Sequence, residues 1–292
     1  MPSKHTADLW PIVSLLIAAT LWGVFWYPLR WLEHSGIGGV GAAALIYAGT
    51  LVPGLMLLHR RWGELGRQSW TLVWLAVASG VCNITFILAM LYGDVVRALL
   101  LFYLSPVWAT LLGHVILGEY ISRRAYTVLG LAMLGALVML VQPGADVVSG
   151  LQLADVLALT SGFTFALVNT LVRRAQTVSV PVKTVVAWWG VLLSAVLLIA
   201  LGAEPVPQPA PLVWGIAALL GLVAMPAMTL SVQYGVTHMP VHRSAVILLF
   251  ELVAGAVSSL WLSDEVISAR EWLGGACVVL AAYLTARRQM ED

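Results

Sequence analysis

The sequence predicts an all-α integral membrane protein with about ten transmembrane helices, arranged as two inverted five-helix repeats. Three observations predict it. The 292 residues are 61% hydrophobic and only 10% charged, whereas soluble domains carry about 25% charged residues. Apolar stretches of roughly 18–25 residues, the length that a membrane-spanning helix needs, recur along the whole chain. Residue identities also recur at an offset of 146, which is half the chain length.

The apolar stretches define the expected spans. The first, after Trp10, is too long for a signal-peptide core and lacks a small-residue cleavage site, so we interpret it as a membrane span. The connections are short and leave no room for a soluble domain, and the alternating ten-residue segments of membrane β-barrels are not seen. The ten spans are expected at 9–29, 37–58, 70–92, 96–117, 124–142, 152–172, 183–202, 212–236, 244–262 and 271–286.

The basic residues indicate the orientation of these spans. With the N-terminus in the cytoplasm, twelve of the fifteen Lys and Arg residues fall in cytoplasmic segments, and only Arg30, Arg97 and Arg270 fall outside. This bias follows the positive-inside rule and predicts that both termini are cytoplasmic in a bacterial inner (plasma) membrane. A net charge of +1 without a basic tract gives no indication of a nucleic-acid partner.

The internal repeat is clearest at one helix corner. Gly118-Glu119-x-Ile121-Ser122 is matched by Asp264-Glu265-x-Ile267-Ser268, and Arg97 is matched by Arg243. We expect the first repeat at 1–142 and the second at 150–288. Because five spans is an odd number, the two copies must have opposite orientations. Inverted repeats are typical of secondary transporters, which bind substrate where the repeats meet.

These corners resemble those of the drug/metabolite transporter superfamily, in its EamA-type branch of ten-helix exporters. Residues 38–47 (GGVGAAALIY) and 102–106 (FYLSP) are similar to the second and fourth helices of aromatic amino acid exporters in that branch. The Glu-Pro pair common in the branch is split here, because Glu251 has no following Pro and Pro106 has no preceding Glu. The resemblance implies export of amino acids, aromatic or otherwise neutral, or of drugs and cationic toxicants.

Polar residues inside the spans are candidates for the transport pathway, because a polar group in hydrocarbon needs a partner. Glu251 shares a helix face with small residues, so it either binds an amine or a proton or holds helices together. Glu251 and His114 are the titratable candidates for proton coupling. The residues expected to line a substrate cavity are Trp22, Asn83, Tyr103, Ser105, Thr164 and Glu251.

Several kinds of chemistry have no motif in this sequence. Neither Lys4 nor Lys183 follows a Gly, so there is no Walker A sequence and the chain alone is not an ATP-driven pump. His238 and His242 are separated by Pro240 in a predicted loop, so we expect no metal site there. We also expect no cofactor and no catalytic residues.

The preferred hypothesis is a carrier that exports a small zwitterion by alternating access, with the substrate and the lipid bilayer as its partners. One alternative is an intramembrane enzyme acting on lipid-linked substrates, although Asp94, Asp155 and Glu251 are scattered over different spans. Another is a channel. The exact substrate, the coupling ion and the choice between monomer and homodimer stay open at this level.

Overall fold

The computed structural model describes residues 9–93, 95–140, 152–262 and 268–291. Within these residues, nine helical segments are long and apolar enough to cross a membrane, and Trp272–Ala286 is a shorter apolar helix. The all-α membrane fold with about ten spans is therefore confirmed. The expected boundary between the repeats, residues 142–150, lies outside the described residues, as do Asp94 and the Asp264-Glu265 corner.

Five of the described spans consist of more than one helix. The first half contains α2 (Trp10–Val24), α3 (Trp26–His34), α4 (Gly39–Gly49), α5 (Leu51–Leu58), the 3-10 turn η1 (Trp62–Gly66), α6 (Ser69–Tyr92), α7 (Val95–Phe102), α8 (Ser105–Leu117) and α9 (Arg123–Leu140). The second half contains α10 (Leu153–Arg174), α11 (Val180–Ala200), α12 (Pro211–Leu219), the π-helical turn η2 (Leu220–Ala224), α13 (Met225–His238), α14 (Val241–Leu248), α15 (Phe250–Leu262) and α16 (Ala269–Glu291).

Local sequence explains several helix ends. Proline stands in the first turn of α2, α11 and α12, where its missing N–H costs nothing because that group has no partner inside the helix. The helix α8 ends at Gly118, whose φ of 66° lies in the left-handed region that glycine adopts readily. Asp155 closes a capping box by accepting a hydrogen bond from the Gln152 N–H at 2.8 Å.

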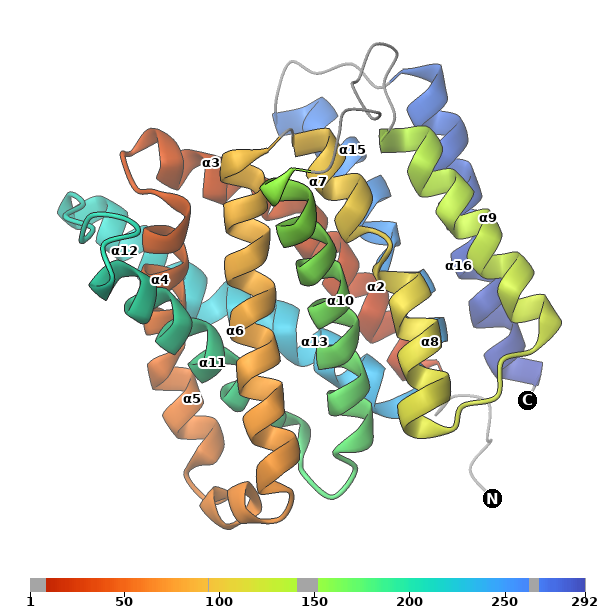
Figure 1. The fold of residues 1–292 in the computed structure, drawn as a ribbon, viewed down its shortest axis with the longest axis horizontal. Coiled ribbons are helices and arrows are strands. Elements are labelled where there is room, and N and C mark those ends of the chain that lie inside the picture. Colours follow the sequence, from red (N-terminus) through yellow and green to blue (C-terminus); the bar gives the residue numbers. More distant parts are fainter. Residues whose placement is uncertain (1–8, 94, 141–151, 263–267, 292) are drawn as a thin grey trace.

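The two halves have opposite directions and are interleaved. In Figure 1, α6, the third span of the first half, runs upward from the lower end of the molecule, whereas α10, the first span of the second half, runs downward from the upper end. Odd-numbered spans therefore have opposite directions in the two halves. The helix α6 of the first half packs against α10 and α11 of the second, α2 packs against α13 and α15, and α9 packs against α16. The main packing is therefore between the halves, so the seams that hold the fold together are also the places where a pathway would open.

Glycines allow the closest of these crossings. A Cβ on Gly190 of α11 would lie 2.0 Å from the Ala76 carbonyl oxygen of α6, and a Cβ on Gly221 of η2 would lie 2.0 Å from the Ile46 carbonyl oxygen of α4. Only glycine lets two backbones approach so closely, as at many helix crossings in membranes. Gly80 meets Gly190 at the first crossing, and Gly49 meets Gly221 at the second. The two crossings occupy equivalent positions of the two repeats. Gly49 in the first half corresponds to Gly190 in the second, and Gly80 corresponds to Gly221, because the same number of residues separates the members of each pair.

Candidate functional site

Two spans are interrupted at equivalent positions of the two halves. Between α7 and α8 the break lies at Tyr103 and Leu104, and between α14 and α15 it lies at Leu249. Tyr103 and Leu249 are related by the same offset that relates Arg97 to Arg243 in the repeat. Pro106 in the first turn of α8 has no N–H to offer the preceding turn, which favours the first break. Discontinuous helices in corresponding spans are typical of transporter binding sites, because they leave backbone polar groups available.

The two breaks are joined by a hydrogen bond between side chains. The Tyr103 hydroxyl donates to Oε1 of Glu251 at 3.0 Å. Glu251 lies in the first turn of α15, and Ser105 is buried at the start of α8. The structure therefore brings together Tyr103 and Glu251, two of the residues selected from the sequence, across the interface between the halves.

An aromatic cluster that includes rings from two further helices adjoins Tyr103 through Phe102. The Phe102 ring lies 5.3 Å from the Tyr103 ring, 4.9 Å from Phe86 of α6 and 5.5 Å from Phe165 of α10, measured between ring centroids. These distances fall in the range in which aromatic pairs attract. Sequence reasoning did not select Phe86 or Phe102 as pathway residues, because a phenyl ring inside an apolar span has no distinguishing pattern.

The other selected residues make local contacts. The Asn83 side-chain amide donates to the Ser79 carbonyl at 3.2 Å, and the Thr164 hydroxyl donates to the Thr160 carbonyl at 2.7 Å. Both bonds run one turn back along the residue's own helix, as short polar side chains often do. The half-buried Trp22 ring packs on Phe25 with 5.5 Å between ring centroids.

His114 is separated from the Tyr103–Glu251 pair. It is exposed near the end of α8, with Nδ1 3.2 Å from the Glu119 carbonyl oxygen. It lies nine positions after Ser105, and at about 1.5 Å of rise per residue this is roughly 14 Å along the helix axis. The two residues selected for proton coupling are therefore not neighbours in this conformation.

A second polar cluster lies at what we call the basic end, the lower end in Figure 1, which contains the loop from Arg60 to Arg67 and the arginines of α9 and α10 (123, 124, 173, 174). Glu119, after α8, accepts a hydrogen bond from the Val241 N–H at 3.0 Å. Its carboxylate also lies 3.7 Å from Nε of Arg173 and 3.4 Å from Nδ1 of His242. This cluster joins the first half to two helices of the second.

Lys183 belongs to the same end of the molecule and is fully buried. Its ammonium group donates to the Val172 carbonyl at 3.0 Å and to the Thr237 hydroxyl at 2.6 Å. Sequence reasoning used Lys183 only as an orientation signal. Because Lys183 stands within an otherwise apolar stretch, the sequence could have indicated that its charged group is buried inside the protein.

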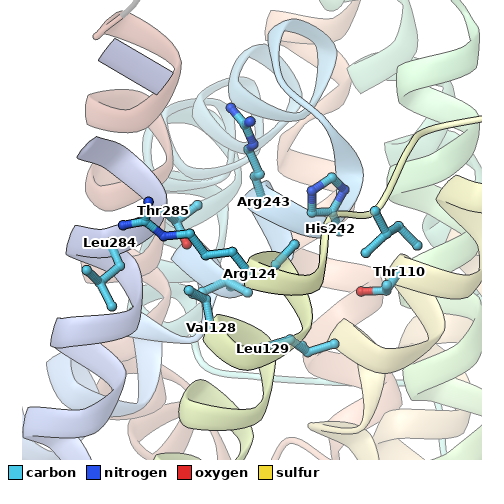
Figure 2. A pocket seen from close by; sticks show the side chains of 11 residues that line it. Thr110, Arg124, Val128, Leu129, His242, Arg243, Leu284 and Thr285 are labelled. Carbon is cyan, nitrogen blue, oxygen red and sulfur yellow. The ribbon is translucent and has the colours of Figure 1, made fainter. Parts of the chain in front are cut away.

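In the described part of the chain, two cavities lie beside the interrupted spans. A pocket of about 30 Å³, enough for roughly two waters, lies between α8, α9, α14 and α16. Figure 2 shows Thr110, Arg124, His242 and Arg243 around it. A larger apolar cavity of about 480 Å³ lies between α9, α15 and α16. Neither of these two is lined by Tyr103 or Glu251.

The model of the EamA-like transporter family matches residues 9–141 and, a second time, residues 152–287. The chain belongs to the EamA-like transporter family. The expected superfamily and the two-repeat organisation are thus confirmed, and the protein is a multi-pass membrane transporter. This EamA-like transporter is 26% identical over 226 residues to an uncharacterized transporter of Archaeoglobus fulgidus, covering 77% of this chain and 79% of the relative.

The fold of this EamA-like transporter is also found in a solved structure. One protein crystal structure superimposes with a TM-score of 0.72 at 19% sequence identity, over 97% of this chain and 99% of the other. At that identity the likeness concerns the fold alone.

Proposed function

We propose that this EamA-like transporter exports small amphipathic solutes, namely amino acids with aromatic or other neutral side chains, across a bacterial inner membrane by alternating access. The observation that carries this proposal is the Tyr103–Glu251 hydrogen bond, which connects the two helix breaks from opposite halves. In the proposed orientation, the basic end and both termini face the cytoplasm, as the positive-inside rule favours.

The chemistry of the pair suits a zwitterion with an apolar side chain. The Glu251 carboxylate is an acceptor for a substrate ammonium group, and the Tyr103 hydroxyl, once released from Glu251, is a donor for a substrate carboxylate. The adjacent rings of Phe86, Phe102 and Phe165 offer an apolar surface to the side chain. A few polar groups among aromatic side chains are the usual composition of a small-molecule site.

Packing around the pair explains why access must alternate. Tyr103 is 8% exposed and Glu251 is partly buried, so a solute would bind both groups only after the packing around them loosens. Separation of the halves at one end would expose the pair to that side, and the Tyr103–Glu251 hydrogen bond would form again after release. This is the rocking of one repeat against the other that inverted-repeat transporters use.

Transport by purified protein in liposomes tests the proposal. Radiolabelled phenylalanine, a labelled aliphatic neutral amino acid and a labelled quaternary ammonium cation are followed separately, with and without a pH gradient. The Tyr103→Phe and Glu251→Gln variants should lose most amino acid transport. The controls are Tyr283→Phe and Glu33→Gln, which remove the same groups from exposed positions and should leave the rate unchanged.

Each outcome has a distinct meaning. Saturable amino acid transport that depends on Tyr103 and Glu251 supports the proposal. Transport of the cation alone would replace the amino acid assignment by a toxicant exporter, for which a carboxylate among aromatic rings is also suited. Rates that do not change with the pH gradient would refute proton coupling through Glu251, and no flux of any solute would refute the proposal as a whole.

A further inference from the structure

Three carboxylates fasten the halves of this transporter to one another by the same contact. Each stands in a connecting segment of one half and accepts hydrogen bonds from the first N–H groups of a helix in the other half. The first N–H groups of a helix have no partner within it and carry partial positive charge, so a carboxylate stabilises them. The three carboxylates are Glu64, Glu119 and Glu204, and they differ in the seam that they fasten.

Glu64 and Glu204 fasten one seam at both of its ends. Glu64 of the first half accepts a hydrogen bond from the Ser179 N–H at 2.7 Å, at the start of α11. Glu204 of the second half accepts bonds from the N–H groups of Val40 and Gly41 at 3.0 and 2.9 Å, at the start of α4. Because α4 and α11 run in opposite directions and pack against each other, these starts lie at opposite ends of their seam.

Electrostatics supports the Glu64 contact. Burial opposes ionisation of this carboxyl group, but the hydrogen bond from the Ser179 N–H and the nearby charges of Arg61 and Arg67 outweigh it. The pKa of Glu64 is therefore lowered from its ordinary value of 4.5, which means that the contact favours the charged carboxylate.

Glu119 fastens a different seam, between α8 and α14. Its carboxylate accepts from the Val241 N–H at the start of α14 and lies beside Arg173 and His242, at the basic end. Both helices are half-helices: α8 begins after the break at Tyr103, and α14 ends before the break at Leu249. Each helix therefore has a point about which it can turn. The pocket lined by Thr110 and His242 shows that space already exists along this seam (Figure 2).

We propose that Glu119 is the latch that closes the transport pathway at the basic end, whereas Glu64 and Glu204 hold α4 and α11 together throughout the transport cycle. The proposal rests on the proposed function, because a latch has a role only where access alternates. Glu119 is a positioning residue rather than a substrate ligand. A seam fastened at both ends by reciprocal contacts cannot open at either end without breaking one of them, whereas the α8–α14 seam has a bend point in each of its helices.

Accessibility of one reporter cysteine tests the latch without any substrate. Thr110 is 6% exposed and lines the same pocket as His242, the neighbour of Glu119. A Thr110→Cys reporter is placed in a Cys82→Ala, Cys277→Ala background and reconstituted in vesicles. A membrane-impermeant cationic methanethiosulfonate is then added from the basic side. Because coupling of about 1–3 kcal/mol corresponds to 5–150-fold shifts in equilibrium, Glu119→Gln should raise the labelling rate about fivefold or more.

Two further sets of variants make the result specific. Glu64→Gln and Glu204→Gln remove the same charge from the same type of contact, so they should leave the labelling rate within about twofold while lowering thermal stability. Val241→Pro removes the N–H that donates a hydrogen bond to Glu119 but keeps the Glu119 carboxylate. Proline is tolerated at the first position of a helix, and the preceding Pro240 already has the extended backbone that a following proline needs, with φ −56° and ψ 140°.

The latch proposal is overturned if labelling is unchanged in both Glu119→Gln and Val241→Pro, or if Glu64→Gln and Glu204→Gln raise it equally. It is supported if labelling rises only in the variants at the α8–α14 seam. Faster labelling in a protein that transports none of the tested solutes would refute the proposed substrate class and leave the latch, which requires only alternating access, standing. Normal transport with unchanged labelling would refute the latch alone.

Discussion

The crossing of α11 over α6 offers a test of the fold at atomic scale. In the Gly190→Ala variant, the new Cβ would lie 2.0 Å from the carbonyl oxygen, 2.6 Å from the carbonyl carbon and 2.7 Å from the Cα of Ala76. Ordinary contact begins at 3.4 Å, so the helices must move well apart at this point. All three atoms belong to the backbone and cannot rotate away, as a side chain could.

The expected cost follows from this geometry. Overpacking typically costs about 1–3 kcal/mol, and the rigid neighbours put Gly190→Ala at the upper end of that range. At about 2–4 °C per kcal/mol for chains of this size, the melting temperature should fall by roughly 6–12 °C. Thermal unfolding in detergent, followed by the fluorescence of the 13 tryptophans, measures the change.

Two comparisons decide whether the reasoning holds. Gly130, within α9, has nothing within 4 Å of its would-be Cβ, so Gly130→Ala should be neutral or slightly stabilising through its better helix propensity. Gly221→Ala meets the Ile46 carbonyl oxygen at the same 2.0 Å, so it should cost about as much as Gly190→Ala. Equal melting temperatures for Gly190→Ala and Gly130→Ala would show that these helices do not cross as described.

Three further substitutions have expected outcomes. Lys183→Met leaves the buried Thr237 hydroxyl without its 2.6 Å donor, so thermal unfolding should show a loss of about 1–3 kcal/mol. Trp26→Phe removes the 2.9 Å indole hydrogen bond to Ser258, and the same measurement should show about 0.5–1.5 kcal/mol. The lowered pKa of Glu64 belongs to the folded state, so its stabilisation is complete above the ordinary pKa and is lost as the pH falls through the lower, folded value. The melting temperatures of wild type and Glu64→Gln should therefore differ at neutral pH and converge as the pH falls below the ordinary pKa of 4.5 and through the lower, folded value.

Span number and position could be predicted because the bilayer dictates them. The required length and apolar composition of each span are local properties, so the sequence near Ser69 or Val241 alone indicates a membrane helix. Interruptions within spans were harder to foresee. Pro106 favours the break near Tyr103, but the equivalent break at Leu249 has no proline or glycine beside it that could indicate it in the sequence.

The repeat was visible in the sequence only over its later part, and the structure explains why. Gly80 and Gly221 occupy equivalent crossings, and Tyr103 and Leu249 occupy equivalent breaks. The number of residues that separates Gly80 from Gly221 is smaller by five than the number that separates Tyr103 from Leu249. The eighth span therefore contains an insertion of that length relative to the third, and the π-helical turn Leu220–Ala224 lies at the start of this stretch. A search at one fixed offset loses the match across such an insertion.

Contacts between the halves set the limit of prediction for the site. Tyr103 and Glu251 were each selected as polar groups in hydrocarbon, but their pairing depends on a separation of 148 residues that no local pattern encodes. Glu119 was visible in the sequence only as part of the repeated helix corner. It instead accepts from Val241, 122 residues away, because the inverted packing brings the start of α14 to that corner.

A division of the protein into a fixed and a moving part follows from these contacts and is itself testable. The glycine crossings join α6 to α11 and α4 to η2. The helices α4 and α11 are also those whose first N–H groups bind Glu204 and Glu64, so close packing and helix capping involve the same part of the protein. The half-helices α8 and α14 take part in neither the glycine crossings nor the contacts of Glu64 and Glu204. Gly190→Ala should therefore lower the melting temperature without changing the labelling of the Thr110→Cys reporter, whereas Glu119→Gln should raise that labelling. If Gly190→Ala also raised the labelling, the two bodies would move as one, and the basic end would open by loosening of the whole fold rather than by release of one carboxylate.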